Sequence, residues 1–177
     1  MRFRLVLVLL PLLAACAAGP VGNPGVPEPA KAVDAQAYVG RWYEFARYEN
    51  RFERGCEGVT ADYAPLPEGR LSVVNTCRKG RLDGEVKVAR GKAKPVGDAK
   101  GAKYKVSFFG PFFGDYWVLD RGDDYSWAIV GEGSGRYLWV LTRDAKPAQQ
   151  TQDALMRRVA QLGYDTKLLR LTRHKAS

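Results

Sequence analysis

The sequence predicts an all-β protein, an eight-stranded antiparallel up-and-down barrel with one C-terminal α-helix packed outside it. Eight short segments rich in β-branched and aromatic residues follow one another between Arg41 and Arg143. Turn residues such as Gly122-Asp123-Asp124 separate them, and one segment with helical spacing follows the last. Strands in this order pair with their sequence neighbours, and closing eight of them leaves no unpaired edge.

The first residues of the chain read as an export signal and not as part of the barrel. Arg2 and Arg4 precede an apolar run from Leu5 to Leu13, and small residues follow. Residues 1–15 are therefore predicted to be a signal peptide. The alternative to a lipoprotein signal is an ordinary signal peptide followed by an incidental cysteine.

The end of this signal, Leu13-Ala14-Ala15-Cys16, resembles the bacterial lipobox. The resemblance implies that the thiol of Cys16 receives a diacylglycerol and that the new amino terminus is acylated. Several acyl chains make such an anchor effectively permanent. Because Ala17 and not Asp follows the cysteine, the resemblance also implies sorting to the cell outer membrane, with the protein facing the periplasm.

The segment after the signal is predicted to be a flexible, lipid-anchored tether over residues 16–35. It contains Pro20, Pro24-Gly25, Pro27 and Pro29 and has no periodic apolar pattern. We expect it to let the folded domain stand away from the membrane. Residues 36–177 are then the folded domain, in a chain with 46% hydrophobic residues, enough for one core.

The first predicted strand carries the densest aromatic content. By the two-residue period, Trp42, Glu44 and Ala46 share one face, and Tyr43, Phe45 and Arg47 share the other. A carboxylate such as Glu44 inside a barrel is more often paired, for instance with an arginine, than catalytic. The eight strands are expected at residues 41–48, 56–66, 70–79, 85–95, 103–109, 115–121, 125–131 and 136–143.

The helix is predicted to begin at Lys146-Pro147 and to end at Gly163. Its apolar side is expected to carry Ala154, Leu155, Val159 and Leu162. Residues 168–172 read as a last short strand, and the basic tail after it as frayed.

Charge and cysteine content narrow the class of protein further. The 28 Lys and Arg outnumber the 19 acidic residues, and without the two arginines of residues 1–15 the net charge is +7. These charges are spread along the strands, which indicates a solvated surface near anionic lipid and makes nucleic acid a poor partner.

In an oxidising compartment, Cys56 and Cys77 are expected to form a disulfide; two free buried thiols are the alternative.

Several motifs together resemble the lipocalin family. They are Gly40-Arg41-Trp42-Tyr43-Glu44 at the first strand, Val106 to Phe112, and Tyr137 to Arg143 followed by a helix. Arg51-Phe52-Glu53-Arg54-Gly55 narrows the likeness to the bacterial outer-membrane subgroup related to apolipoprotein D. The resemblance implies that Trp42 and Arg143 close the barrel floor, with the guanidinium across the indole, a contact of about 1–2 kcal/mol when desolvated.

A barrel of this size holds one small ligand. Small residues at Ala89, Gly91 and Ala93 leave volume, and aromatic residues give flat apolar walls, a profile typical of a lipid pocket. Arg51, Arg54 and Lys105 are candidate cations at its mouth. The alternative, equally compatible with the sequence, is that they only cover the solvated surface. The expected ligand contacts, for each of which plain core packing is the alternative, are Tyr63, Val73, Asn75, Tyr104, Val106, Phe108, Tyr116, Val118, Val130, Tyr137 and Trp139.

An enzyme is not expected, and neither a metal nor another cofactor is. The only histidine, His174, lies in the tail, so no Ser-His-Asp or Cys-His arrangement is available. The resemblance implies a lipid partner, a fatty acid or lysophospholipid, and a role in membrane maintenance. Two alternatives remain: a structural lipoprotein whose barrel is filled by its own side chains, and a lipid-modifying enzyme. A homodimer is left open.

Overall fold

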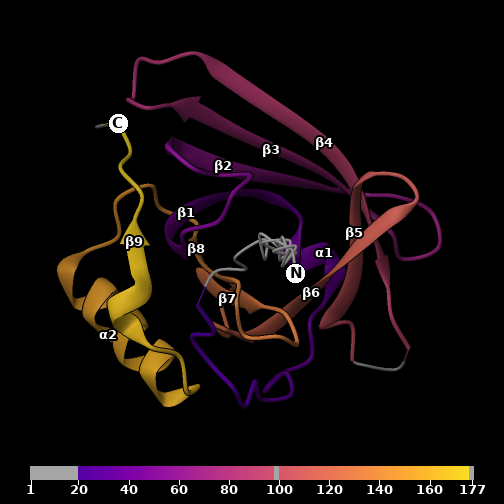
Figure 1. Cartoon of the computed structure of the whole chain (residues 1–177). Helices are drawn as coiled ribbons and strands as arrows, with labels where there is room; N and C mark the ends of the chain where they lie inside the picture. The colour runs from indigo at the N-terminus through magenta and orange to yellow at the C-terminus, as the bar shows by residue number, and fades with distance from the viewer. Residues whose placement is uncertain (1–19, 98–99, 176–177) are drawn as a thin grey trace, which may run out of the picture.

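The structure, a computed structural model, describes residues 20–97 and 100–175. Eight antiparallel strands form a closed barrel, seen along its axis in Figure 1. Each strand pairs with the next, and β1 pairs with both β2 and β8, which closes the ring. The strands are β1 (Gly40–Tyr48), β2 (Cys56–Pro65), β3 (Leu71–Lys79), β4 (Val86–Pro95), β5 (Lys103–Phe109), β6 (Phe112–Arg121), β7 (Trp127–Gly131) and β8 (Leu138–Thr142).

Two helices and a ninth strand complete the fold. The short helix α1 (Ala35–Tyr38) lies at the end of the barrel where β1 begins, and the carboxylate of Asp34 caps it by accepting from the amide of Gln36. Helix α2 (Gln149–Gln161) packs outside the barrel, and a single 3₁₀ turn (Thr166–Leu168) leads into β9 (Leu169–Leu171). Strand β9 pairs with the second half of β1, where β2 has diverged from it.

The apolar residues form two main clusters, one on each side of the barrel wall. The inner cluster fills the end next to α1 and includes Trp42, Tyr63 and Tyr104. The outer cluster joins Leu155 and Val159 of α2 to strands β1, β6, β7 and β8. Because alternate residues of a strand face opposite sides, the same strands supply both clusters.

Several local predictions differ from the structure: helix α2 begins at Gln149 and not at Lys146-Pro147, and β7 and β8 are shorter than expected. Strand β6 begins at Phe112, three residues before the expected start, so the β5–β6 turn is shorter. Ala154 is exposed on α2, and Met156 contributes to the outer cluster. A register shift between Glu44 and Ala46 places Ala46 in the outer cluster and turns Arg47 toward Glu44, which a strict two-residue period does not foresee.

The N-terminal segment is attached to the barrel from Gly22 onward. The amides of Gly22 and Asn23 donate to the carbonyl of Gly135 at 2.9 and 3.2 Å, and the Ala30 amide donates to Leu119 at 2.8 Å. Gly22 lies against the ring of Tyr48, where a Cβ would clash. The expected free tether over residues 16–35 is therefore a bound strap over residues 22–34. The predicted signal peptide and Cys16 lie outside the described residues.

Candidate functional site

Trp42 and Arg143 lie at the end of the barrel next to α1, which we call the closed end. The Arg143 guanidinium lies 3.8 Å from the centre of the Trp42 ring, and Trp42 is fully buried. Arg143 also donates to the carbonyl oxygens of Arg41 at 2.7 Å and Val39 at 2.9 Å, and Trp42 Nε1 donates to that of Tyr38 at 2.8 Å. These contacts tie the chain entering β1 to the end of β8, and desolvation lowers the pKa of Arg143.

Three tyrosines fill the barrel directly beside this floor. The hydroxyl of Tyr116 lies 2.8 Å from those of both Tyr38 and Tyr63. Burial is the main cause that raises the pKa of all three phenols. Each therefore keeps its proton at neutral pH, and the trio forms a neutral hydrogen-bonded plug that leaves this half of the barrel to the protein's own side chains.

The other end of the barrel, the open end, is not filled in this way. Ala61, Asn75 and Ala89 stand opposite one another across β2, β3 and β4 and so face the interior together. Ala61 is buried, Asn75 is partly exposed and Ala89 is exposed. Along β4, the inward-facing residues change from buried Ala93 through partly exposed Gly91 to exposed Ala89, so exposure rises toward the open end and defines a cup in that half of the barrel.

The expected ligand contacts divide between the two halves. Five of them are buried among the packed core of the barrel: Tyr63, Val73, Tyr104, Val118 and Val130. Six keep partial exposure: Asn75, Val106, Phe108, Tyr116, Tyr137 and Trp139. Tyr116 belongs to the tyrosine plug, so the other five are the ones that remain available to a ligand. Of the candidate cations, Lys105 pairs with Asp115 at 2.7 Å on the outer face, while Arg51 and Arg54 are exposed in the β1–β2 loop.

A notch of about 370 Å³ opens in the wall of the cup between β4 and β5. These strands pair only from Lys92↔Ser107 to Pro95↔Tyr104, so they separate toward the open end. The ring of Phe108 covers Gly91, where a Cβ would meet it at 2.8 Å. Phe113 and Gly110 complete the apolar lining, and Arg90 and Lys92 add two cations. A second cavity, of about 570 Å³, lies outside the barrel near Arg143 and Asp144.

Stacked aromatic rings and a carboxylate form the opposite wall of the cup. Phe52 stacks on Tyr137 with 5.6 Å between ring centres, and Tyr137 stacks on Trp139 at 5.9 Å. Trp139 Nε1 donates to Glu53 Oε2 at 2.8 Å, which ties the β1–β2 loop to β8. Sequence periodicity placed Tyr137 and Trp139 inside the barrel, but it gave no sign that Phe52 and Glu53 join them.

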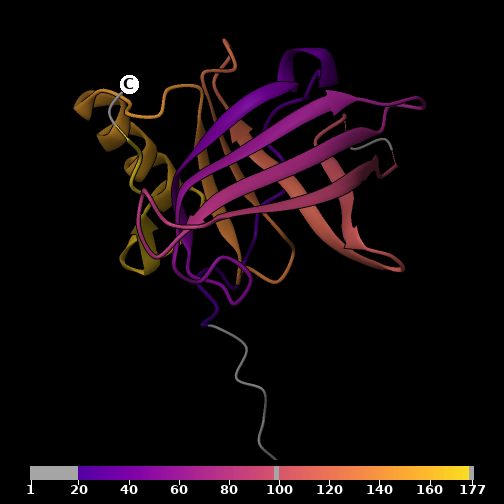
Figure 2. The same cartoon turned by 90° about the horizontal axis from the view of Figure 1, so that it is seen from above.

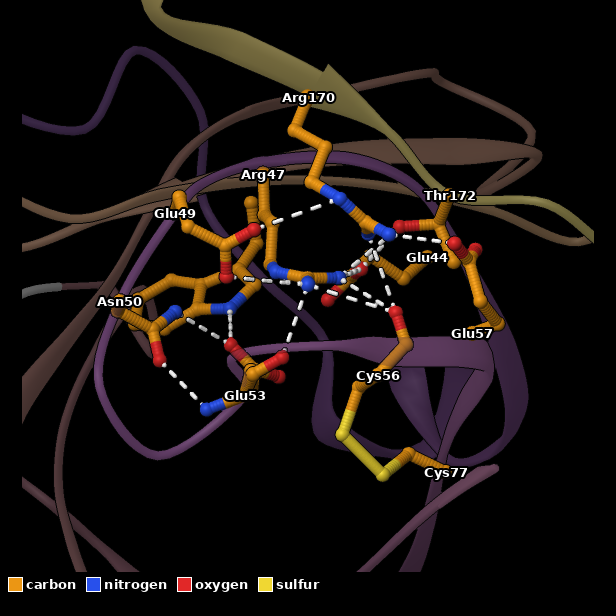
Figure 3. The surroundings of a disulfide bond; sticks show 11 residues. Glu44, Arg47, Glu49, Asn50, Glu53, Cys56, Glu57, Cys77, Arg170 and Thr172 are labelled. Atoms are coloured by element: carbon orange, nitrogen blue, oxygen red, sulfur yellow. Dashed lines mark hydrogen bonds and ion pairs between the residues drawn. A yellow bond between two sulfur atoms is a disulfide. The ribbon is translucent and has the colours of Figure 1, made fainter. Parts of the chain in front are cut away.

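A buried ion pair lies where β1 and β2 diverge (Figure 3). Arg47 donates to Glu44 Oε1 at 2.6 Å and to the carbonyl of Glu53 at 2.9 Å, and both Arg47 and Glu44 are almost completely buried. Thr172, just after β9, donates to the same carboxylate oxygen. Burial and then the charge of Glu53 raise the pKa of Glu44 to about 8, although Arg47 and Thr172 act to lower it.

The predicted disulfide is confirmed and lies next to this ion pair (Figure 3). Cys56 at the start of β2 is bonded to Cys77 near the end of β3, with their Cα atoms 5.4 Å apart. The carbonyl of Cys56 accepts from Arg170 at 3.1 Å. The bridge therefore joins β2 to β3 at the open end, and the hydrogen bond from Arg170 ties this edge to the C-terminal segment.

Within residues 20–97 and 100–175, no group of three or more His, Cys, Asp or Glu side chains is placed to hold a metal ion. Over the same residues, no helix has the length and apolar character needed to cross a membrane.

The lipocalin-like domain family matches residues 33–174, and the chain belongs to the lipocalin family. Among its relatives, it is similar to the outer membrane lipoprotein Blc of Vibrio cholerae, with 39% identity over 85% of this chain and 88% of that protein. The outer membrane lipoprotein Blc of Escherichia coli K12 is 37% identical over 89% of this chain and 92% of its own.

The chain is also similar to more distant proteins. Apolipoprotein D of Macaca fascicularis is 31% identical over 78% of this chain and 76% of that protein. The solved structure of insecticyanin from the tobacco hornworm Manduca sexta superimposes with a TM-score of 0.69 at 22% identity, over 86% of this chain and 88% of that one. At this identity the likeness is one of fold: a closed eight-stranded barrel with a helix after the eighth strand.

Proposed function

We propose that this protein is an outer-membrane lipoprotein that faces the periplasm and binds a fatty acid or lysophospholipid in the open half of its barrel, as part of membrane maintenance. The observation that carries this proposal is the gradient of exposure along the barrel interior. The closed half is packed, whereas the open half keeps partly exposed aromatic walls around the small residues Ala89 and Gly91. Such a cup accepts an elongated apolar chain.

The cup also offers polar atoms for a lipid headgroup. The buried Oδ1 of Asn75 has no hydrogen-bond partner among the described residues, so it is an acceptor suited to a hydroxyl or ammonium group. Arg90 and Lys92 lie on the outer face of β4 at the notch, where they supply positive charge for a carboxylate or phosphate at its entrance. A lysophospholipid presents both kinds of group, and a fatty acid presents the second.

A bulky residue inside the cup should compete with the ligand. Ala89 faces the interior, so Ala89→Trp is expected to weaken binding of palmitate and of a palmitoyl lysophospholipid by at least about tenfold, or 1.4 kcal/mol. The neighbouring Val88 faces outward and is exposed, so Val88→Trp is the matched control and should leave affinity unchanged. Isothermal titration of the purified protein measures both.

The outcomes separate the proposal from its alternatives. Saturable binding that both variants leave intact would place the ligand outside the cup. No saturable binding, and no lipid in extracts of the purified protein by mass spectrometry, would favour the structural lipoprotein with a filled barrel. Chemical conversion of the added lipid would favour an enzyme.

The proposed anchor is tested at Cys16. In a Gram-negative host that is fed radiolabelled palmitate, Cys16→Ser is expected to abolish label on the protein, because no other free thiol is expected in the mature chain. Cys56→Ser is the matched control: it removes a cysteine of the disulfide and should keep the label. Label that persists in Cys16→Ser would contradict acylation at this residue.

A further inference from the structure

The open end of the barrel carries an unusual concentration of exposed aromatic rings. Phe109 and Phe112, which pair across the β5–β6 hairpin, are 78% and 76% exposed, and Phe113 is 49% exposed. Phe52, on the β1–β2 loop, is 61% exposed. Exposed phenylalanine side chains at this density are typical of a surface that binds a membrane or another molecule.

Basic side chains surround the hairpin rings. Lys94 Nζ lies 4.4 Å from the centre of the Phe113 ring, and Arg90 and Lys92 line the notch beside it. These three alternate with the inward-facing residues of β4 and so lie on the outer face. On the other side of the mouth, Arg51 and Arg54 are exposed next to Phe52.

Three of the acidic side chains around this mouth have partners among the described residues, whereas Glu85 in the β3–β4 loop is exposed. Asp115 pairs with Lys105 at 2.7 Å, and Glu53 accepts from Trp139. Glu132 accepts from the amide and hydroxyl of Ser134. Apolar rings within a ring of positive charge complement the interface of a bilayer that contains anionic lipid.

The path of the N-terminal strap points to the same end of the molecule. The amide of Gly22 is bonded to Gly135 in the β7–β8 loop at the open end, and from there the strap runs to α1 at the closed end. The side view of Figure 2 shows the described chain starting on the side of the barrel opposite α1. The chain therefore reaches the barrel at its mouth.

The length of the chain between Cys16 and the barrel limits which end of the barrel can face the membrane. Gly22 is six positions after Cys16, a reach of at most about 22 Å. A barrel of ten-residue strands at the usual tilt is about 25 Å high. An acyl anchor at Cys16, attached at the open end, therefore favours an orientation in which the open end faces the bilayer.

We propose that the open end is a membrane-docking surface: the Phe109–Phe113 hairpin inserts at the headgroup level of the anchoring bilayer, its flanking cations contact anionic headgroups, and the cup opens toward the lipid. The orientation rests on the proposed acylation of Cys16, while the docking surface rests on the hairpin. A lipid ligand then enters from the membrane through the mouth and the β4–β5 notch without crossing bulk water.

The test uses the acylated protein in phosphatidylethanolamine vesicles with and without phosphatidylglycerol. An environment-sensitive dye is placed through Arg51→Cys at the open end or through Gln36→Cys on α1 at the closed end, both exposed positions. With nitroxide-labelled lipid, we expect strong quenching of the dye at position 51 and little at position 36. Equal quenching at both positions, or stronger quenching at position 36, would overturn the orientation.

Variants then test the hairpin itself. Phe109→Ser/Phe112→Ser/Phe113→Ser should lower quenching at position 51 to the level at position 36, whereas Val96→Ser, an exposed apolar residue beyond β4 at the closed end, should change nothing. Arg90→Ser/Lys92→Ser should weaken docking by about fivefold per cation, only with phosphatidylglycerol present. Quenching that survives the triple substitution, or a mouth-to-mouth dimer in place of docking, would refute the docking surface. Palmitate titration of the same variants reports separately on the proposed ligand function.

Discussion

At pH 9, above the pKa of about 8 that burial gives Glu44, an Arg47→Met variant is expected to lose about 3–5 kcal/mol of folding free energy, because the ionised carboxylate of Glu44 is then buried without its cation. Arg47 also donates to the carbonyl of Glu53, so the β1–β2 loop loses a bond that holds it over the cup. Urea unfolding followed by circular dichroism measures the loss. The double variant Arg47→Met/Glu44→Leu should recover part of it, since no uncompensated charge then remains.

The Glu44–Arg47 pair makes the free energy of unfolding depend on pH, and the raised pKa of Glu44 sets the direction of the change. Burial raises the pKa of Glu44 to about 8, so the folded state binds this proton more tightly than the unfolded state does. The stabilisation is fully present below the ordinary glutamate pKa and is lost as the pH rises toward 8. We expect the free energy of unfolding of the protein to fall between pH 5 and pH 8, and that of the double variant Arg47→Met/Glu44→Leu, which lacks this carboxyl group, to fall much less. Equal slopes would contradict this role of Glu44.

Trp42→Ala is expected to cost about 3–5 kcal/mol, as for other large aromatic residues removed from a core. The substitution removes a fully buried indole, the ring beneath the Arg143 guanidinium and the hydrogen bond from Nε1 to Tyr38. Of the floor's bonds to α1, those that Arg143 donates to Ala37 and Tyr38 then remain without the one from Trp42. Thermal unfolding measures the loss, and Trp117→Ala, a partly buried residue of the outer cluster, is the matched control with a smaller expected effect.

Ligand binding distinguishes the floor from the cup. Trp42→Phe keeps an aromatic ring under Arg143, and Trp42 packs on Tyr38, which belongs to the tyrosine plug and not to the cup. We therefore expect Trp42→Phe to keep the palmitate affinity while lowering the unfolding temperature. A loss of affinity as large as that of Ala89→Trp would show that the ligand reaches the floor.

The fold was predictable because its signals are local in the chain. Turn residues mark where each strand ends, and the two-residue period assigns residues such as Val73 and Val118 to the interior. The pairing of Cys56 with Cys77 followed because only these two cysteines remain after Cys16. The sequence did not show how deep each inward-facing residue lies along the barrel axis, because that depth depends on the register between strands, which is set by the tertiary structure. Tyr63 and Trp139 therefore stood together as candidates although they lie in different halves.

The features that position the proposed site depend on contacts between distant segments. The shift after Glu44 has no residue signature, because it arises where β1 exchanges β2 for β9 as its partner. The strap over residues 22–34 reads as a loose proline-rich linker, yet the barrel wall supplies its hydrogen-bond partners.

The sequence by itself determined the class of fold, the disulfide and the inward alternation of the strands, since hydrophobic period and turn chemistry act over a few residues. Only the tertiary structure decided that Trp42 and Arg143 meet, that a tyrosine plug fills one half of the barrel, and that the strap begins at the open end. Closing the barrel brings together residues that are about a hundred positions apart, and no local pattern encodes which of them pack and which stay exposed.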